Sequence, residues 1–392
     1  MKLAWFRPDQ PSPPPSLDDS AALVAELRST HEIEQFTAAN AHDFTRRHAR
    51  AAYDLSVYEL DDTIAHAFIW PYLLHYGGVL QLRTLSLHQS RATVLFGEQR
   101  AQDYAAEFTF SHGDWPGQPP VAPLARPGDW SMLRVPALAA RIVVLSHEAT
   151  IDVVQRAHPE ALVRLARTGV CATPETQGDH RGPPAAPVHP GPAVMFGAVP
   201  GDRLDVVRRA MARARHAGAP ADLMAEASPE LLVQNADVVV SLTWPSRGEP
   251  QTPALAAMAA AKPVIVSESP ASAGWPALDP QTWQPRGRTP DAPIAISIDP
   301  RDEEHSLVLA IRRLSAEATL RAQLGQAARN WWRTHATPEL AADDWRRILD
   351  EAALLPAPLR PVDWPAHLTA DGTMRDLERL NAGRRAGDVL SP

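Results

Sequence analysis

Cysteine and lysine are both scarce in this sequence. Cys171 is the sole cysteine, which excludes a disulfide framework and a site built from several thiolates. Lys2 and Lys262 are the only lysines. The 15 histidines include no pair at the helical spacing of a zinc site. No Gly-x-Ser-x-Gly sequence marks the nucleophile of a hydrolase. We therefore expect no resident metal or cofactor and no serine-hydrolase chemistry.

Long apolar runs and basic runs are missing as well. No stretch of about 20 apolar residues could span a membrane. The opening MKLAWF reaches Arg7 and Pro8 too early to be a secretion signal. The 38 basic and 46 acidic residues give a formal charge of −8, which argues against a nucleic-acid partner. These absences predict a soluble, cytoplasmic protein without a transmembrane segment.

What is present is an alternation of strand-like and helix-like segments. A chain of 392 residues predicts about two domains, and alternating elements predict mostly parallel sheets. The predicted strands are Leu3–Phe6, Glu32–Phe36, Asp54–Tyr58, Val79–Leu82, Ile142–Leu145, Ala193–Phe196, Asp237–Leu242, Val264–Val266 and Ile294–Ile298. The predicted helices are Asp19–Arg28, Glu148–Ala157, Leu204–Ala217, Ala254–Ala261 and three near the end of the chain, the last of them capped by Thr337 and Pro338.

Composition divides the chain into five parts. Residues 1–171 form the first α/β domain, and the Pro- and Gly-rich residues 172–192 form a linker. Residues 193–336 form the second α/β domain, and residues 337–355 form a further helix. The polar residues 356–392 form a tail that is disordered in part or holds one docked helix near Met374–Leu380.

The most informative stretch is Asp237–Ser267. Two short apolar strands flank a loop that ends in Gly248 and Glu249. Thr252 is predicted to cap the following helix, with Pro253 as its first residue. Such a strand–helix–strand unit opens its loop at the carboxyl edge of a sheet, where open α/β folds bind ligands. Free N–H groups at the helix start favour a phosphate.

This stretch resembles the donor-nucleotide loop of the family-4 glycosyltransferases, in particular a bacterial branch. Further similarity covers about two-thirds of the chain. The segments that carry it are KLAWFRPDQP, YDLSVYELDDTIAHAFIWPYLLHYGGVLQL, RIVVLSHEATIDVVQRAHPEALVRLARTGV, VMFGAVPGDRLDVVRRAMARAR and IRRLSAEATLRAQLGQAARNWWRTHATPELAADDWRRILDEA. The resemblance implies a GT-B fold, with two Rossmann-like domains facing each other across a cleft and the helix 337–355 crossing back to the first domain.

The resemblance also implies a function. It predicts retaining transfer of a sugar from a nucleotide-diphosphate sugar, without a metal, to an unknown acceptor that is a glycan, a lipid or a small molecule. The alternative is a catalytically degenerate GT-B protein that binds a ligand or a partner such as another glycosyltransferase. A third possibility is another GT-B chemistry such as epimerisation of a sugar nucleotide.

Several departures from the family favour the degenerate alternative. The stiff run Pro11–Pro15 replaces the family's early glycine-rich loop, and proline has no N–H to offer a ligand. Arg83 and Thr84 occupy the positions of a His-Asp pair. Ala257 replaces a second acidic residue, but the bacterial branch also has a small residue there, so this loss does not decide between the alternatives. Between Ala217 and Asp237 the chain is short by what would be a strand and a helix, which predicts a shortened second domain.

Two residues are candidates for catalysis. By resemblance Glu249 would contact hydroxyl groups of the donor sugar, although an acidic residue near a helix start is favoured by the helix dipole in any case. His88, near the family's reactive edge, could act as acid, base or sugar contact, or it could be a structural histidine. The aromatic residues Phe68, Trp70, Tyr72 and Tyr76 are expected to pack the first core.

A second group of residues would bind the donor. Arg203 stands where the family places a phosphate-binding basic residue, and a guanidinium fits phosphate oxygens well. Arg247 is a second candidate cation. Each arginine could instead be a solvated or surface-paired side chain. The remaining candidates are Gly197, Gly248 and Thr252, which are also ordinary residues for a strand, a turn and a helix cap.

Overall fold

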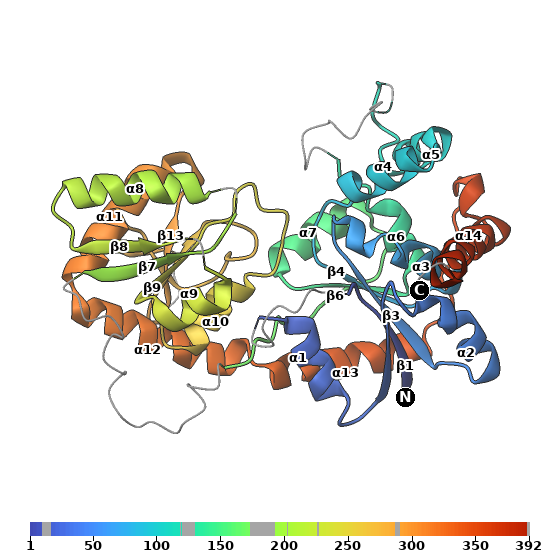
Figure 1. Ribbon diagram of the computed structural model, residues 1–392, viewed down its shortest axis with the longest axis horizontal. Helices are drawn as coiled ribbons and strands as arrows, with labels where there is room; N and C mark the ends of the chain where they lie inside the picture. The colour runs from blue at the N-terminus through green and yellow to red at the C-terminus, as the bar shows by residue number, and fades with distance from the viewer. Residues whose placement is uncertain are drawn as a thin grey trace.

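The computed structural model contains two α/β domains side by side, with the second on the left in Figure 1. It describes residues 1–9, 17–117, 119, 130–172, 193–201, 203–225, 227–286 and 291–389, the last few of these without their side chains. The run Pro11–Pro15 and nearly all of the predicted linker therefore lie outside the described residues.

The first domain is built on a parallel sheet. In the described residues it has six strands in the order β2-β1-β3-β4-β5-β6. The strands are β1 (Lys2–Phe6), β2 (Glu32–Phe36), β3 (Leu55–Leu60), β4 (Val79–Leu82), β5 (Ile142–Leu145) and β6 (Val163–Leu165). The helices are α1 (Asp19–Leu27), α2 (Phe44–Arg50), α3 (Ile69–Tyr76), α4 (His88–Gly97), α5 (Ala101–Ser111), α6 (Arg134–Ala139) and α7 (Glu148–Ala157).

Apolar strands and aromatic residues explain the first domain's core. Strands β3 and β4 are buried along their whole length, as expected of parallel strands covered on both faces. Phe6 stacks on Tyr58 with ring centroids 4.9 Å apart. The predicted packing of Phe68, Trp70, Tyr72 and Tyr76 into this core is confirmed.

The second domain has a larger sheet than the sequence predicts. Its strands lie in the order β12-β11-β13-β10-β9-β7-β8, parallel except for the β11–β12 pair. They are β7 (Val194–Ala198), β8 (Ala221–Met224), β9 (Val238–Ser241), β10 (Val264–Ser267), β11 (Ala277–Leu278), β12 (Pro285–Arg286) and β13 (Ala295–Ile298). The helices are α8 (Leu204–His216), α9 (Pro229–Asn235), α10 (Thr252–Ala259), α11 (Glu303–Ala316) and α12 (Ala318–His335).

The prediction of a missing strand and helix between Ala217 and Asp237 is wrong. Strand β8 pairs with β7 at the edge of the sheet, and α9 follows it. Ser228 caps α9 through its side chain, and Pro229 is its first residue. Both elements are short and β8 is only partly apolar, so neither stands out as a periodic pattern in the sequence.

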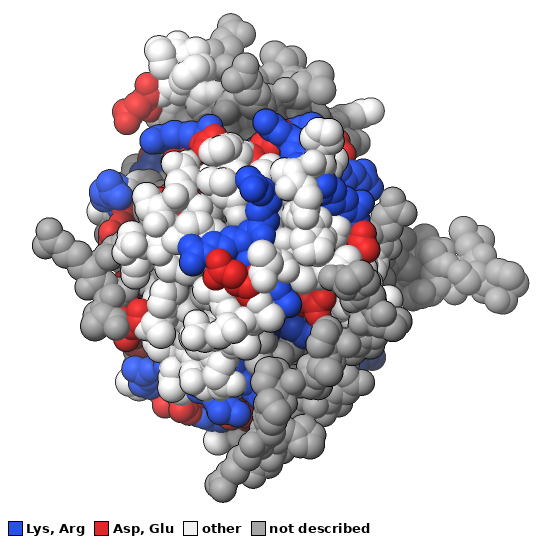
Figure 2. All heavy atoms as spheres, turned by 90° about the vertical axis from the view of Figure 1, so that its left-hand side faces the viewer, with Lys and Arg blue, Asp and Glu red and all other residues white. Residues whose placement is uncertain are grey.

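The two faces of the second sheet carry different helices. Figure 1 shows α8 and α11 on one face and α9, α10 and α12 on the other. The outer end of this domain has basic and acidic side chains interspersed (Figure 2). Two of the arginines on α8, Arg209 and Arg213, both pair with Glu304 of α11. This face therefore shows no continuous basic surface.

The last helices return to the first domain. Thr337 caps α13 (Pro338–Leu354) through its side chain, as the sequence predicts. Trp345 of α13 packs on Trp5 of β1, with ring centroids 5.2 Å apart. Helix α14 (Ala370–Val389) lies beside α3, where Thr373 is 3.0 Å from a ring nitrogen of His75. No helix in the described part of the chain is long and apolar enough to cross a bilayer.

Candidate functional site

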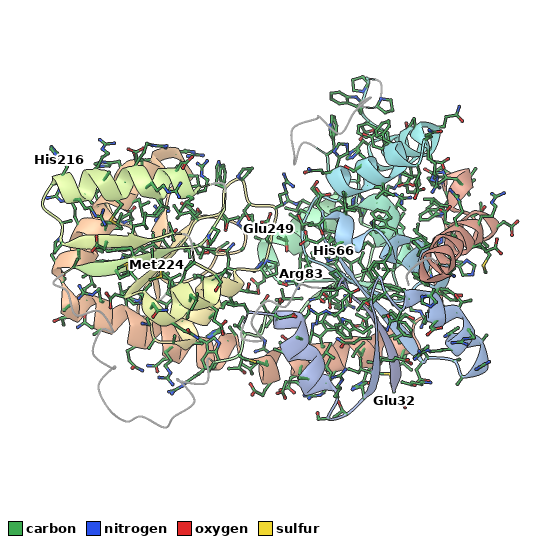
Figure 3. The ribbon with its side chains drawn as sticks, in the orientation of Figure 1. Glu32, His66, Arg83, His216, Met224 and Glu249 are labelled. Atoms are coloured by element: carbon green, nitrogen blue, oxygen red, sulfur yellow. The ribbon has the colours of Figure 1, made fainter. Side chains whose placement is uncertain are left out.

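The loop between β9 and α10, residues 242–251, belongs to the second domain and contacts the first. The N–H of Leu85, after β4, donates to the carbonyl oxygen of Arg247 at 2.6 Å. The guanidinium of Arg247 lies 3.5 Å from the carboxylate of Asp62, which follows β3 and is 5% exposed. Figure 3 shows Glu249 in this loop beside the first domain, with Arg83 and His66 nearby and Glu32 at the far end. The carboxyl edges of the two sheets therefore face each other.

Gly248 lets the loop approach the first domain closely. Its φ of +86° is a conformation that residues with a side chain rarely adopt. A Cβ at this position would lie 2.9 Å from Cγ2 of Thr150 and 3.4 Å from Cγ of Leu85. The sequence predicts close approach to a ligand, whereas the contact in the structure is with the opposite domain.

We expect Gly248→Ala to weaken this contact between the domains. Gly218→Ala is a matched control, because Gly218 has a φ of +85° and nothing within 4 Å of its Cβ position. The control should lose about 1 kcal/mol of unfolding free energy from backbone strain alone, and Gly248→Ala about 1–2 kcal/mol more from overpacking. Urea denaturation measures both, and small-angle scattering should show wider domain separation for Gly248→Ala only. Equal effects of the two variants would mean that the contact contributes nothing.

The carboxylate of Glu249 closes a turn within its own loop. It accepts hydrogen bonds from the N–H of Arg247 at 2.9 Å and from the hydroxyl of Ser246 at 3.2 Å. The backbone of Glu249 also bonds the ring of His147, at the start of α7. Burial lowers the pKa of His147 to about 4, although that hydrogen bond opposes the shift. His147 is therefore neutral at neutral pH, and Glu249 shapes the loop whatever else it contacts.

Helix α10 begins with two N–H groups that have no acceptor among the described residues. The structure makes Thr252 its first residue, preceded by Gln251 with no side-chain cap, so the predicted capping by Thr252 is wrong. Instead, the Gln251 side chain bonds Ser241 and Thr243 at 3.4 Å each. Among the described residues, nothing accepts from the N–H of Thr252 or of Ala254. Together with the helix dipole, these groups favour an anion.

Arg203 lies at the start of α8 and is already paired. Its guanidinium binds both carboxylate oxygens of Glu303, with Nε 3.0 and 3.1 Å from them. The arginine is 27% exposed and the glutamate 6%. A phosphate would therefore have to compete with this carboxylate or share the guanidinium with it.

Two of the predicted site residues lie away from the loop. His88, the first residue of α4, is buried with Nε2 2.8 Å from the hydroxyl of Tyr104 in α5, so it packs between these helices. Gly197 lies inside β7, where a Cβ would meet Ala236 at 2.8 Å and Leu232 at 3.3 Å. Close packing against α9 therefore explains this glycine without a ligand.

The carboxyl edge of the first sheet carries buried charges that the sequence analysis missed. Arg7 pairs with Asp18 at 2.6 Å, and Arg83 pairs with Asp19 at 2.9 Å. The carboxylate of Glu59, on β3, instead accepts hydrogen bonds from uncharged donors. In the sequence, the one hint of these buried charges was Arg83, which stands where the family has a His-Asp pair. These residues come from β1, β3, β4 and α1, so no local motif could join them.

Glu59 is the most deeply placed of these groups. It accepts from the indole N–H of Trp5 at 2.6 Å and from the hydroxyl of Ser20 at 2.9 Å. Burial raises the pKa of the Glu59 carboxyl, with Arg7 and Arg83 opposing the shift. Nearby, burial lowers the pKa of His66 to about 4. No cluster of three or more potential metal ligands occurs in the part of the chain that the structure describes.

A small polar cavity, with a volume of about 10 Å³, lies beside this edge. It is lined by Asp19, Gln81 and Thr168 among others. The side-chain oxygens of Gln81 and Thr168 are buried without a partner there. The space suits a single water molecule, so it is too small for a substrate.

Solved structures share this arrangement of two parallel sheets. Sucrose-phosphate synthase from Thermosynechococcus elongatus matches with a TM-score of 0.55 at 12% identity, over 90% of this chain and 98% of that one. The chain has the GT-B fold. HepE from Anabaena, solved with UDP and glucose, matches with a TM-score of 0.54 at 11% identity, over 90% and 100% of the two chains.

A further match to the GT-B fold is a glycosyltransferase from Rickettsia africae, with a TM-score of 0.52 at 10% identity over 91% and 99% of the chains. No sequence family and no curated protein matches the chain. At these identities the likeness shows the fold, and the predicted GT-B fold class is confirmed. Membership of the family-4 glycosyltransferases stays a prediction.

Proposed function

We propose that this GT-B protein binds a nucleotide-diphosphate sugar at the start of α10 and transfers the sugar to an acceptor held by the first domain. The observation that carries the proposal is the pair of N–H groups at Thr252 and Ala254, for which the described part of the chain offers no acceptor. They lie at the end of a loop that bonds the opposite domain, so a diphosphate bound there would place its sugar between the two sheets.

Three features suit the chemistry of the donor. Transfer leaves a diphosphate whose growing charge must be stabilised, and helix N–H groups with a nearby guanidinium do this without a metal. The candidate guanidinium is that of Arg203, which follows β7 in the chain. To bind the diphosphate, it would release the carboxylate of Glu303 and bond phosphate oxygens instead. The neighbouring fold of HepE, which has been solved with UDP and glucose, supports a sugar nucleotide as the ligand class. Retention of the anomer follows from the family resemblance.

The proposal predicts binding of at least one sugar nucleotide. UDP-, GDP-, ADP- and dTDP-sugars are screened by thermal shift, since a ligand that binds only the native state must raise the Tm. Arg203→Ala should weaken donor binding by about tenfold or more, the effect of one charged hydrogen-bonding group. Arg209→Ala is the matched control, because Arg209 also lies on α8 and pairs with Glu304. Binding and slow donor hydrolysis should survive EDTA.

Each variant is compared with its own ligand-free Tm, because Arg203→Ala leaves the buried Glu303 unpaired. No Tm shift with any of the four donor classes would contradict the proposal. Equal donor affinity in the two arginine variants would show that Arg203 does not bind the donor.

A second candidate function is that of a degenerate GT-B protein that binds a ligand or a partner, such as another glycosyltransferase, without turnover. The observation that favours it is that polar side chains of the predicted site already have partners within the protein. Examples are Arg247 with Asp62, Arg203 with Glu303, and Glu249 with its own loop. This function predicts a Tm shift with a donor but no release of free nucleotide from it.

A further inference from the structure

A groove of about 820 Å³ runs along the outer face of α12. Figure 1 shows α12 at the lower edge of the second domain, on the opposite face of the sheet from α8 and α11. Gln323, Gln326 and Asn330 line the groove from successive turns of the helix, and Trp331 and His335 line one end. None of these residues belongs to the loop 242–251 or to the start of α10, so the groove is separate from the proposed donor site.

The groove contains little charge. Its described lining has Asp291 and His335 as the only ionisable residues, and no arginine. Helix α12 nevertheless carries several arginines, and Arg333 is exposed but lies outside the lining. A phosphate-bearing ligand would need a basic partner here, so the groove suits an uncharged ligand.

Side-chain amides give the groove its hydrogen-bonding character. Nε2 of Gln326 donates to Oδ1 of Asn330 at 3.0 Å. This bond leaves the carbonyl oxygen of Gln326 and the amino group of Asn330 without a partner among the described residues. One acceptor and one donor side by side match two neighbouring hydroxyl groups of a sugar ring.

Aromatic rings form one end of the groove. The ring of His335 stacks on that of Trp331 with centroids 4.6 Å apart and an interplanar angle of 4°. Trp275 lies against Trp331 at 5.6 Å and an angle of 56°. Trp275 supports Trp331 from outside the lining, and the indole N–H of Trp331 has no acceptor among the described residues. A flat apolar surface with polar tips fits the C–H face and the hydroxyl edge of a pyranose.

We propose that the α12 groove binds a neutral oligosaccharide chain. The sparsely charged lining, the amide pair and the aromatic end together match a polyhydroxyl ligand that has both apolar faces and hydroxyl edges. The volume exceeds that of one sugar ring and lies within the range of ligand sites in general, so it accommodates a short chain. The groove would bind a glycan and would not catalyse a reaction on it.

The test uses the full chain with maltohexaose, cellohexaose and chitohexaose as probes. Binding is followed by saturation-transfer NMR and by tryptophan fluorescence. At least one saccharide should bind, and the double variant Gln326→Ala with Asn330→Ala should weaken its affinity about tenfold or more. Both side chains are exposed, so the variant should keep its fold, which its Tm checks.

Two controls locate the binding. Arg333→Ala changes the same helix outside the groove and should leave saccharide affinity unchanged. Arg203→Ala should also leave it unchanged, which separates the groove from the donor site. The proposal is overturned if none of the three saccharides binds, or if their binding survives the double variant. Binding of an oligoproline peptide in place of the saccharides would likewise overturn it and assign the groove to a protein segment.

Discussion

Glu107→Ala should lower the free energy of unfolding by about 3–5 kcal/mol, because it leaves a buried guanidinium without its carboxylate. Glu107 of α5 is 1% exposed and Arg91 of α4 is 6% exposed. Nε of Arg91 donates to Glu107 at 2.8 Å, and a second nitrogen donates to its other oxygen. The ring of His367, before α14, lies 2.8 Å from the same carboxylate. Urea denaturation measures the loss.

Glu304→Ala is the control, since Glu304 binds two arginines at the surface and its loss should barely change stability. The double variant Arg91→Met with Glu107→Leu should be more stable than Glu107→Ala, because no charge remains buried. If Glu107→Ala were as mild as Glu304→Ala, the pair would not be buried in solution as the structure has it.

The same carboxylate predicts how stability depends on pH. Burial alone would raise the pKa of Glu107, but Arg91 and then His367 lower it to about 2, below the usual 4.5. A depressed pKa in the folded state contributes stability above pH 4.5, which is lost as the pH falls towards 2. Urea midpoints measured across this range should fall more steeply for the wild type than for Glu107→Gln.

Gly325→Ala should destabilise the second domain by about 3 kcal/mol or more, through overpacking against a rigid backbone. Gly325 lies inside α12, where a Cβ would be 2.0 Å from the carbonyl oxygen of Ala261, just after α10. The contact is with backbone, so no side chain can move aside. The helix propensity of alanine, about 1 kcal/mol better than that of glycine, would act in the opposite direction.

Gly97→Ala is the matched control for Gly325→Ala. Gly97 ends helix α4, and nothing lies within 4 Å of its Cβ position. This variant should be neutral or more stable by up to about 1 kcal/mol. Chemical denaturation of both variants separates the effect of overpacking on unfolding free energy from that of helix propensity. A stabilising Gly325→Ala would show that α12 does not approach α10 so closely.

Most elements with a strong local pattern could be predicted from the sequence. Strands Glu32–Phe36, Val79–Leu82 and Ile142–Leu145 and helix Glu148–Ala157 are found with the predicted bounds. Ile142–Leu145 is an uninterrupted apolar run, Val79–Leu82 is apolar except for Gln81, and Glu148–Ala157 is an amphipathic helix. The elements β8, α9, β11 and β12 were missed because each is short, and the edge strands β8 and β12 lack a continuous apolar run.

The candidate site could be predicted only in part. The sequence located the β9–α10 loop and the helix start, because Gly248, Thr252 and Pro253 carry local signals for a turn and a helix. It could not show that Arg203 binds Glu303, a hundred residues away, or that His88 packs on Tyr104. Such partners depend on which helices lie side by side.

By itself the sequence determined the alternation of strands and helices and the position of a phosphate-suited helix start. Both follow from hydrophobic period and turn chemistry within a few residues. Only the tertiary structure decided that the loop 242–251 contacts the first domain, that Gly325 is required by a neighbouring backbone, and that a groove with little charge follows α12. These three features depend on contacts between segments far apart in the chain. The energy of such contacts is set by distance and burial, which local composition does not determine.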